Sequence, residues 1–200
     1  MKRRPDRRVF VLVAAIGVWL AGAAAGRAQA LPAEQEAFWQ ALRGLCGQAF
    51  AGKVVESTSA TDAAFAGQRL TMHVRSCGDS EIRIPFHVGD NRSRTWVITR
   101  TATGLRLKHD HRHEDGTEDK VTQYGGDTVG AGAAGEQSFP ADEFTAKLIP
   151  AAKTNVWTFL VSPGKTLSYR LVRAAEGRRF RVEFDLTRPV AAPPPPWGSK

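Results

Sequence analysis

Hydrophobic and polar residues alternate along most of the chain from Phe50 onwards, with the period of two that is typical of half-buried β-strands. Because successive side chains on a strand point to opposite faces, each run separates an inward set from an outward set. Turn-forming residues separate the runs. The inward sets expected from this pattern are Leu70, Met72 and Val74; Ile82, Ile84, Phe86 and Val88; Trp157, Phe159 and Val161; Leu167, Tyr169 and Leu171; and Phe180, Val182, Phe184 and Leu186.

Other segments break the alternation. Glu34 to Leu45 repeats its apolar residues at helical spacing and is predicted to be a short helix, and Pro140 to Ile149 is a second helical candidate. Gly125 to Gly135 is small and glycine-rich, so we expect a mobile loop there. The strand at 94–100 has two possible inward faces, because Trp96 and Val97 compete for the core.

The stretch Leu105 to Tyr124 has the clearest alternation. Apolar residues and histidines take one parity and charged residues take the other, so we expect His109, His111 and His113 to face inward. Asp115-Gly116 is a strong signal for a two-residue hairpin turn. The register of that turn places Glu118 opposite His113, Lys120 opposite His111, Thr122 opposite His109 and Tyr124 opposite Leu107.

These runs predict an all-β domain of eight or nine strands, mostly joined as hairpins, with one short N-terminal helix. A one-sided sheet of that size must close or fold over to bury its apolar face, which favours an antiparallel meander closed as a barrel. A β-sandwich is the alternative. The layout resembles the calycin (lipocalin-like) barrels, although their Gly-x-Trp signature is absent, since Gly52 is followed by Lys53 and Val54.

The runs KHDHRHEDGTEDKVTQYGGDT and SFPAD are also similar to an uncharacterised family of exported bacterial proteins. That resemblance would cover most of the chain after residue 30. It implies export but brings no activity with it, so it assigns no role to any residue.

Residues 1–30 have the form of an export signal: five Lys or Arg residues, an apolar run from Val9 to Ala25, and the cleavage motif Ala28-Gln29-Ala30. Cleavage after Ala30 would leave a periplasmic or secreted protein with no stable membrane span. The paired Arg7 and Arg8 also fit a twin-arginine signal. We therefore expect a single barrel domain over 31–187 and a proline-rich, disordered tail over 188–200.

The net charge of +8 overstates the basicity of the exported part. Residues 1–30 carry six of the 28 Lys and Arg residues and one of the 20 acids, which leaves 22 and 19, a net of +3. A nucleic-acid-binding protein needs a concentrated basic face, so that function class is excluded. The two cysteines, Cys46 and Cys77, predict a disulfide in an exported protein; two buried free thiols are the alternative.

The first functional hypothesis is a ligand site on the histidine face. The expected ligand-binding residues are His109, His111, His113, Lys120, Thr122 and Tyr124. A few convergent polar groups above an apolar floor are typical of sites for small molecules, and Lys120 favours a polar or anionic ligand. Arg94 joins this set if Trp96 faces inward.

The second hypothesis is a divalent metal site for Zn or Cu, either as a store or as the centre of an enzyme. Alternate residues on a strand lie about 6.6 Å apart, so three histidines in line cannot share one ion without strain. The better set is His111, His113 and Glu118. The ammonium of Lys120 would oppose it by charge repulsion.

The third possibility is a structural protein of the cell envelope in which the histidines only meet water or each other. No Ser-His-Asp spacing, phosphate-binding glycine loop or CxxC motif points to a particular reaction. The other two histidines, His73 and His87, fall on the outward parity and are expected to be solvated. The pattern by itself leaves the natural ligand, catalysis and the oligomeric state open.

Overall fold

Strands dominate a computed structural model of the chain, which describes Met1 and residues 30–199. Ten of them pair with antiparallel neighbours in the order β7-β6-β5-β4-β2-β1-β11-β10-β9-β8, and the short β3 pairs with β4 beside this path. Their bounds are β1 Ala49–Ser57, β2 Leu70–His73, β3 Ser76–Cys77, β4 Glu81–Val88, β5 Asn91–Arg100, β6 Leu105–His111, β7 Tyr124–Asp127, β8 Glu136–Pro140, β9 Asn155–Ser162, β10 Thr166–Arg173 and β11 Arg178–Val190. The expected export signal lies outside the described residues, apart from its first and last residue.

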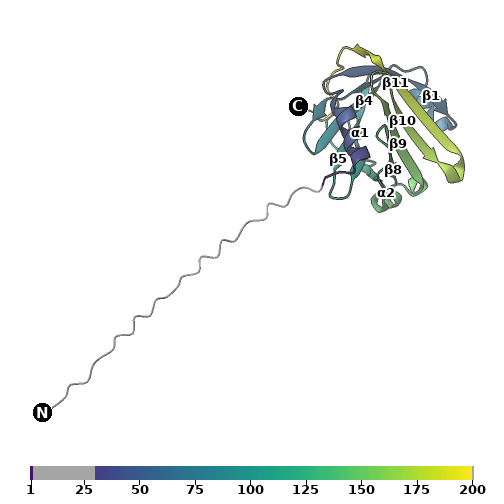
Figure 1. Ribbon diagram of the computed structural model, residues 1–200. Helices are drawn as coiled ribbons and strands as arrows, with labels where there is room; N and C mark the ends of the chain where they lie inside the picture. The colour runs from purple at the N-terminus through teal and green to yellow at the C-terminus, as the bar shows by residue number, and fades with distance from the viewer. Residues whose placement is uncertain (2–29, 200) are drawn as a thin grey trace.

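The strands curl into a nearly closed barrel (Figure 1), in which β7 and β8 are the two ends of the hydrogen-bonded path. The gap between them is narrow, because a Cβ built on Gly126 would lie 1.8 Å from the carbonyl oxygen of Pro140. The helix α2, Glu143–Leu148, bridges the gap. The Thr145 hydroxyl donates to the carbonyl of Gly125 and accepts from its amide, at 2.8 and 2.7 Å.

The inward sets predicted from the alternation are all buried in one core cluster, which confirms the all-β prediction and favours the barrel over the sandwich. Trp96 is 3% exposed and belongs to that cluster, so the strand at 94–100 turns Trp96 and Arg94 towards the barrel axis. Large aromatic side chains fill most of the interior, among them Phe50, Trp157 and Phe184.

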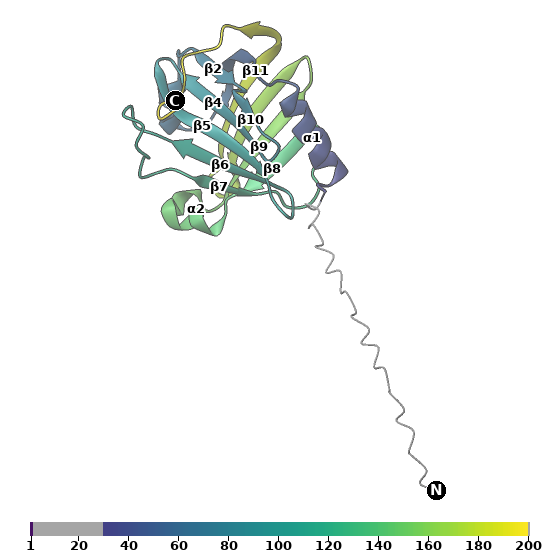
Figure 2. The same cartoon turned by 90° about the vertical axis from the view of Figure 1, so that its left-hand side faces the viewer.

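One end of the barrel is covered by the helix α1, Ala33–Arg43, which confirms the predicted helix near Glu34 to Leu45 (Figure 2). Its apolar face is fully buried in the barrel core through Phe38, Trp39 and Leu42. Polar contacts at its start fix its position: Glu36 pairs with Arg100 at the end of β5 at 2.8 Å. The opposite end of the barrel is free of this helix.

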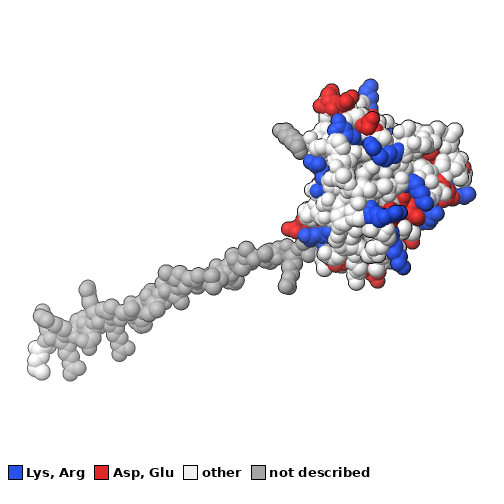
Figure 3. Space-filling model, turned by 90° about the horizontal axis from the view of Figure 1, so that it is seen from above, with Lys and Arg blue, Asp and Glu red and all other residues white. Residues whose placement is uncertain are grey.

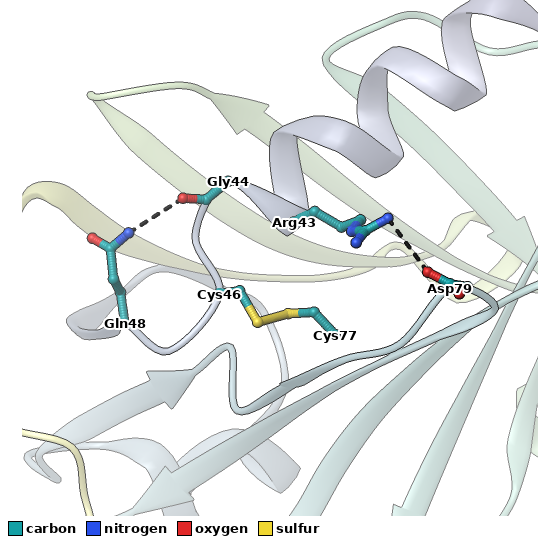
Figure 4. Close-up of a disulfide and its surroundings, with 6 residues drawn as sticks. All are labelled: Arg43, Gly44, Cys46, Gln48, Cys77 and Asp79. Carbon is teal, nitrogen blue, oxygen red and sulfur yellow. Dashed lines mark hydrogen bonds and ion pairs between the residues drawn. A yellow bond between two sulfur atoms is a disulfide. The ribbon is translucent and has the colours of Figure 1, made fainter.

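The predicted disulfide is present. Cys46 and Cys77 are bonded across 31 residues and join the segment after α1 to β3 (Figure 4). The same figure shows the Arg43 side chain directed at Asp79, 3.9 Å from its carboxylate, at the end of that helix. These contacts tie the covering helix to the sheet.

The glycine-rich segment differs from its prediction, because Gly125 and Gly126 belong to β7 and only the residues after it form a loop. Glycine is required here since a Cβ on Gly125 would lie 2.0 Å from the carbonyl oxygen of Leu107. The strand β8 was not predicted. It is five residues long and ends on Pro140, so its alternation is too short to separate it from a loop.

The hairpin register was also wrong. His109 lies opposite Tyr124 instead of Thr122, and Leu107 lies opposite Gly126. The Asp115-Gly116 turn does form, with Gly116 donating to the carbonyl of His113, but the second arm is not a continuous strand. There the backbone amides of His111 and Val121 donate to the side-chain oxygens of Thr122 and Asp119, so the turn alone did not set the register.

The strand β11 continues to Val190, beyond Arg188, where the proline-rich tail was expected to begin. Residues 191–199, here called the C-terminal strap, then cross the outside of the barrel beside β4 and β5 (Figure 2). The Trp197 amide donates to the carbonyl of Arg92 at 3.1 Å. The strap lies over His87, which is 3% exposed, and His73 is 8% exposed, so the prediction that both histidines are solvated was wrong.

Charged side chains of both signs are interspersed on the face shown in Figure 3. Among the described residues, no helix has both the length and the apolar character needed to cross a membrane.

Candidate functional site

The end of the barrel opposite α1 brings polar side chains together above the aromatic core. We call this end the mouth. It is formed where β5 begins, β6 ends, β7 begins, β10 ends and β11 begins, and the short 3-10 helix η1, Ala60–Phe65, lies over it. The polar side chains that line its cavities include Arg94, His109, His111, Tyr124, Tyr169 and Arg178.

His109 is the innermost of these groups and is 3% exposed. Its Nδ1 lies 3.0 Å from the carbonyl oxygen of Tyr124, and its Nε2 lies 2.7 Å from the hydroxyl of Tyr169. A carbonyl oxygen can only accept a hydrogen bond, so the neutral ring carries its proton on Nδ1. Its Nε2 then accepts a hydrogen bond from the Tyr169 hydroxyl. The ring is also stacked on Tyr124, with centroids 4.4 Å apart.

Burial keeps this chain of hydrogen bonds uncharged. It lowers the pKa of His109 to about 3, and the nearby His111 adds to the shift. Burial also raises the pKa of Tyr169 well above its usual value. A hydrogen bond with the Trp96 side chain lowers that pKa but does not offset the effect of burial. The base of the mouth is therefore a neutral, fully hydrogen-bonded floor.

His111 and Tyr124 lie above that floor. The Tyr124 hydroxyl and His111 Nε2 are 3.2 Å apart, and both groups line the same small cavity. Burial lowers the pKa of His111 to about 4 and raises the pKa of Tyr124 to about 12. Gln123, directly before Tyr124, has a φ of 59°, which is uncommon for a residue with a side chain and turns the chain into β7.

Arg94 faces the same cavity from β5, as expected once Trp96 is inward. Its guanidinium lies over the ring of Phe65, 5.5 Å from the centroid, and donates to the side-chain oxygen of Asn91. Within residues 30–199 no carboxylate lies within ion-pair distance of it. Burial lowers the pKa of Arg94, but a guanidinium remains charged at any physiological pH.

Two adjoining cavities occupy the mouth. The one beside Arg94 and His111 has a volume of about 70 Å³, and its neighbour has about 210 Å³. They share Phe65, Tyr124, Tyr169 and Phe180. The larger one also meets Arg173 and Arg178, of which Arg178 is paired with the buried Asp62 at 2.6 Å.

The structure brings together half of the predicted ligand-binding residues: His109, His111 and Tyr124. Thr122 is buried, but its hydroxyl accepts from the amide of His111 at 2.8 Å and so supports the backbone. His113 and Lys120 are exposed, outside both cavities. The ladder between β6 and β7 ends at the pair His109 and Tyr124. The chain beyond this pair leaves the barrel wall, so His113 and Lys120 lie outside the mouth.

The proposed metal residues do not converge. Glu118 is exposed and accepts from Arg112 and Gln123, at 3.2 and 3.3 Å, while His113 points to solvent. Over the described part of the chain, no group of three histidine, cysteine or acidic side chains is placed to hold a metal ion.

Several mouth residues were not predicted as site residues. Tyr169 and Trp157 were assigned to the core, and they do pack there, but Tyr169 also closes the hydrogen-bond chain of His109. Phe65 comes from a segment with no inward pattern, whereas Arg178 has the inward parity of Phe180 and Val182 at the start of β11, a signal that could have found it. The position of Phe65 depends on the path of η1, which only the three-dimensional structure supplies.

Comparison with protein-family models, with curated proteins and with solved structures finds no match to this chain. The barrel is compatible with the calycin-like layout, and the resemblance to an exported family stays a prediction.

Proposed function

We propose that this protein binds a small anionic molecule with a flat apolar body at the mouth of its barrel. The observation that carries the proposal is Arg94, a partly buried cation that faces a cavity and has no carboxylate partner within residues 30–199. Removing a charge from water costs free energy unless a counter-charge is supplied, so an anionic ligand would complete this site.

The other polar groups support the same ligand charge. His111 and Tyr124 are neutral at physiological pH and provide hydrogen bonds, not negative charge. Arg173 and Arg178 also line the wider cavity, and each is paired with a carboxylate, Glu176 at 2.9 Å and Asp62 at 2.6 Å. The excess positive charge at the mouth is therefore that of Arg94, which favours an acidic ligand.

The shape of the mouth limits the size of the ligand. Large side chains fill most of the interior, so we place the ligand at the mouth and not deep within the barrel. Cavities of about 70 and 210 Å³ are each smaller than the roughly 300–1,000 Å³ usual for drug-sized ligands, so they suit a molecule with only a few ring atoms. The rings of Phe65, Tyr124 and Phe180 offer apolar surfaces to a planar group.

We further propose that the protein acts outside the cytoplasm, after removal of residues 1–30, as a single domain. The Cys46–Cys77 disulfide is compatible with an oxidising compartment. The basic, apolar and small-residue sections of the first thirty residues support export, by either the general or the twin-arginine route.

A pair of isosteric probes tests the charge requirement. Benzoate and benzamide are titrated into the protein at low ionic strength and followed by calorimetry and two-dimensional NMR. We expect benzoate to bind and to shift the signals of mouth residues, and benzamide to bind at least about tenfold more weakly, because only benzoate forms a charge-assisted pair.

Two variants separate the mouth from general surface charge. Arg94→Gln keeps a polar side chain but removes the charge, and should weaken benzoate binding by about tenfold or more. Lys120→Ala removes an exposed cation from the neighbouring loop and should leave the affinity unchanged. The proposal fails if neither probe binds, if both bind equally, or if Arg94→Gln binds benzoate as well as the original protein does.

A further inference from the structure

A cavity of about 680 Å³ lies on the outside of the barrel, beneath the C-terminal strap. Its floor is the outer face of β1, β2 and β4, through Ala51, Thr71 and His87. Its other wall is the strap, through Pro193, Pro194 and Trp197. It shares no residue with the cavities of the mouth.

The floor carries a polar atom without a partner. His87 is 3% exposed, and its Nε2 has no hydrogen-bond partner among the described residues. Burial lowers the pKa of His87 to about 4, with Arg92 and His73 adding to the shift, so the imidazole is neutral at physiological pH. A buried polar atom is nearly always hydrogen-bonded, but this one has almost no accessible surface, so it lies behind the cavity wall while other parts of the residue line the cavity.

The strap supplies a second such atom. The indole nitrogen of Trp197 is buried and also lacks an acceptor in residues 30–199. The strap is held by three contacts near its end. The backbone amide of Trp197 donates to the carbonyl of Arg92, and the Arg92 guanidinium donates to the carbonyl of Pro195 at 3.1 Å. Gly198 packs on Gly116. The backbone that carries the indole is thus held by contacts of the residues before and after Trp197.

The rim of the cavity is balanced in charge. Arg69 and Arg92 face Asp90 and Glu114, and Arg69 lies 3.9 Å from Asp90. This differs from the mouth, where the cations outnumber the acids. A rim of planar donors and acceptors with no net charge favours a neutral ligand with many hydrogen-bonding groups over an anion.

We infer that this cavity is a second binding site, for a neutral polyhydroxylated ligand of the size of a short saccharide. Hydroxyl groups both donate and accept, so they can pair with the guanidiniums and with the carboxylates of the rim. The apolar C–H face of a sugar ring would lie against Trp197 and the prolines. The volume falls within the range of small-molecule sites.

The test uses three neutral trisaccharides of different linkage: cellotriose, chitotriose and maltotriose. Each is titrated into the protein and followed by calorimetry, which gives the Kd for every variant, and by the indole N–H signal of Trp197, assigned with the variant Trp197→Phe. We expect at least one sugar to shift this signal. Its Kd should rise about tenfold in Trp197→Ala and in Glu114→Gln, which remove an aromatic surface and a charged acceptor respectively.

The control variant is Arg94→Gln, which alters the mouth and should leave sugar affinity unchanged. Near-identical circular dichroism and melting temperature of the strap variants would show that the barrel is retained. The inference is overturned if no sugar shifts the Trp197 signal up to about 10 mM, above the millimolar range of weak sites. It is also overturned if the sugars bind Trp197→Ala as tightly as the original protein.

Discussion

At the scale of single residues, the mouth depends on how burial changes the chemistry of histidine. His109 and His111 lie on the same strand face, two residues apart, yet their surroundings differ. His109 has both ring nitrogens occupied by protein partners, so it serves as a structural group. His111 has one ring nitrogen near Tyr124 and faces the cavity, which leaves it able to contact a ligand.

The first prediction follows from the low pKa of His109. In the unfolded chain this group binds a proton below about pH 6.5, while in the folded protein it does so only near pH 3. Between these values the unfolded state binds more protons, so stability is full above pH 6.5 and falls as the pH is lowered. At pH 5 the expected loss from His109 is about 2 kcal/mol.

Urea denaturation at pH 7 and pH 5 measures this loss. His109→Gln cannot titrate, so it should be less stable than the original protein at pH 7 but should lose less stability on acidification. If the two proteins lose the same free energy between these pH values, the buried neutral state of His109 is contradicted. His87 and His111 contribute in the same direction, because their pKa values are both lowered to about 4.

At the scale of elements, the seam between β7 and β8 is the weak point of the barrel. No ladder of backbone hydrogen bonds joins these strands in the described structure, and α2 spans the gap through Thr145 and through the Asp142 amide, which donates to Gly125. The seam therefore needs close approach of backbones, and two glycines allow it. Glycine marks a close approach here, where the sequence pattern indicated flexibility.

The second prediction is that Gly126→Ala destabilises the protein by about 3 kcal/mol or more, as expected when a methyl group is forced into a packed site. The new Cβ would meet the Pro140 carbonyl at 1.8 Å, and backbone cannot move aside as a side chain can. Gly78→Ala is the matched control, since its Cβ would come no closer than 3.5 Å to a neighbour. Thermal and urea melts compare them, and equal effects of the two variants would contradict the close seam.

At the scale of the whole molecule, the barrel is held at one end by a covering helix and is open at the other. The apolar face of α1 completes the core, and the disulfide fixes the end of α1 to the sheet. Closing one end and not the other explains why both mouth cavities lie among the strand ends far from α1.

The third prediction concerns this attachment. The double variant Cys46→Ser, Cys77→Ser should lose about 3–4 kcal/mol of unfolding free energy, because the 31-residue separation gives the unfolded chain more freedom once the link is gone. Urea denaturation of the variant and of the original protein with and without reductant measures it. The variant should have the same free energy of unfolding as the reduced original protein. A loss below about 1 kcal/mol would mean that the link contributes little to global stability.

The sequence by itself determined most of the strands and their inward sets through alternation, the covering helix through helical spacing, and the disulfide through its two cysteines. These features depend on local periodicity and on residue type, which a strand or helix expresses without reference to distant parts of the chain. Arg94 is a clear example, since its inward position followed once Trp96 was buried.

Only the tertiary structure decided the site itself. The turn at Asp115-Gly116 is local, but the ladder beyond it depends on Gln123, on two glycines in β7 and on α2, so the register that removed His113, Lys120 and Glu118 was not encoded in the turn. The strap is similar, because its prolines suggest an extended tail while its contacts with Arg92 and Gly116 lie far away in sequence. Alternation specifies which face a side chain takes, but contacts between distant segments decide which side chains meet on that face.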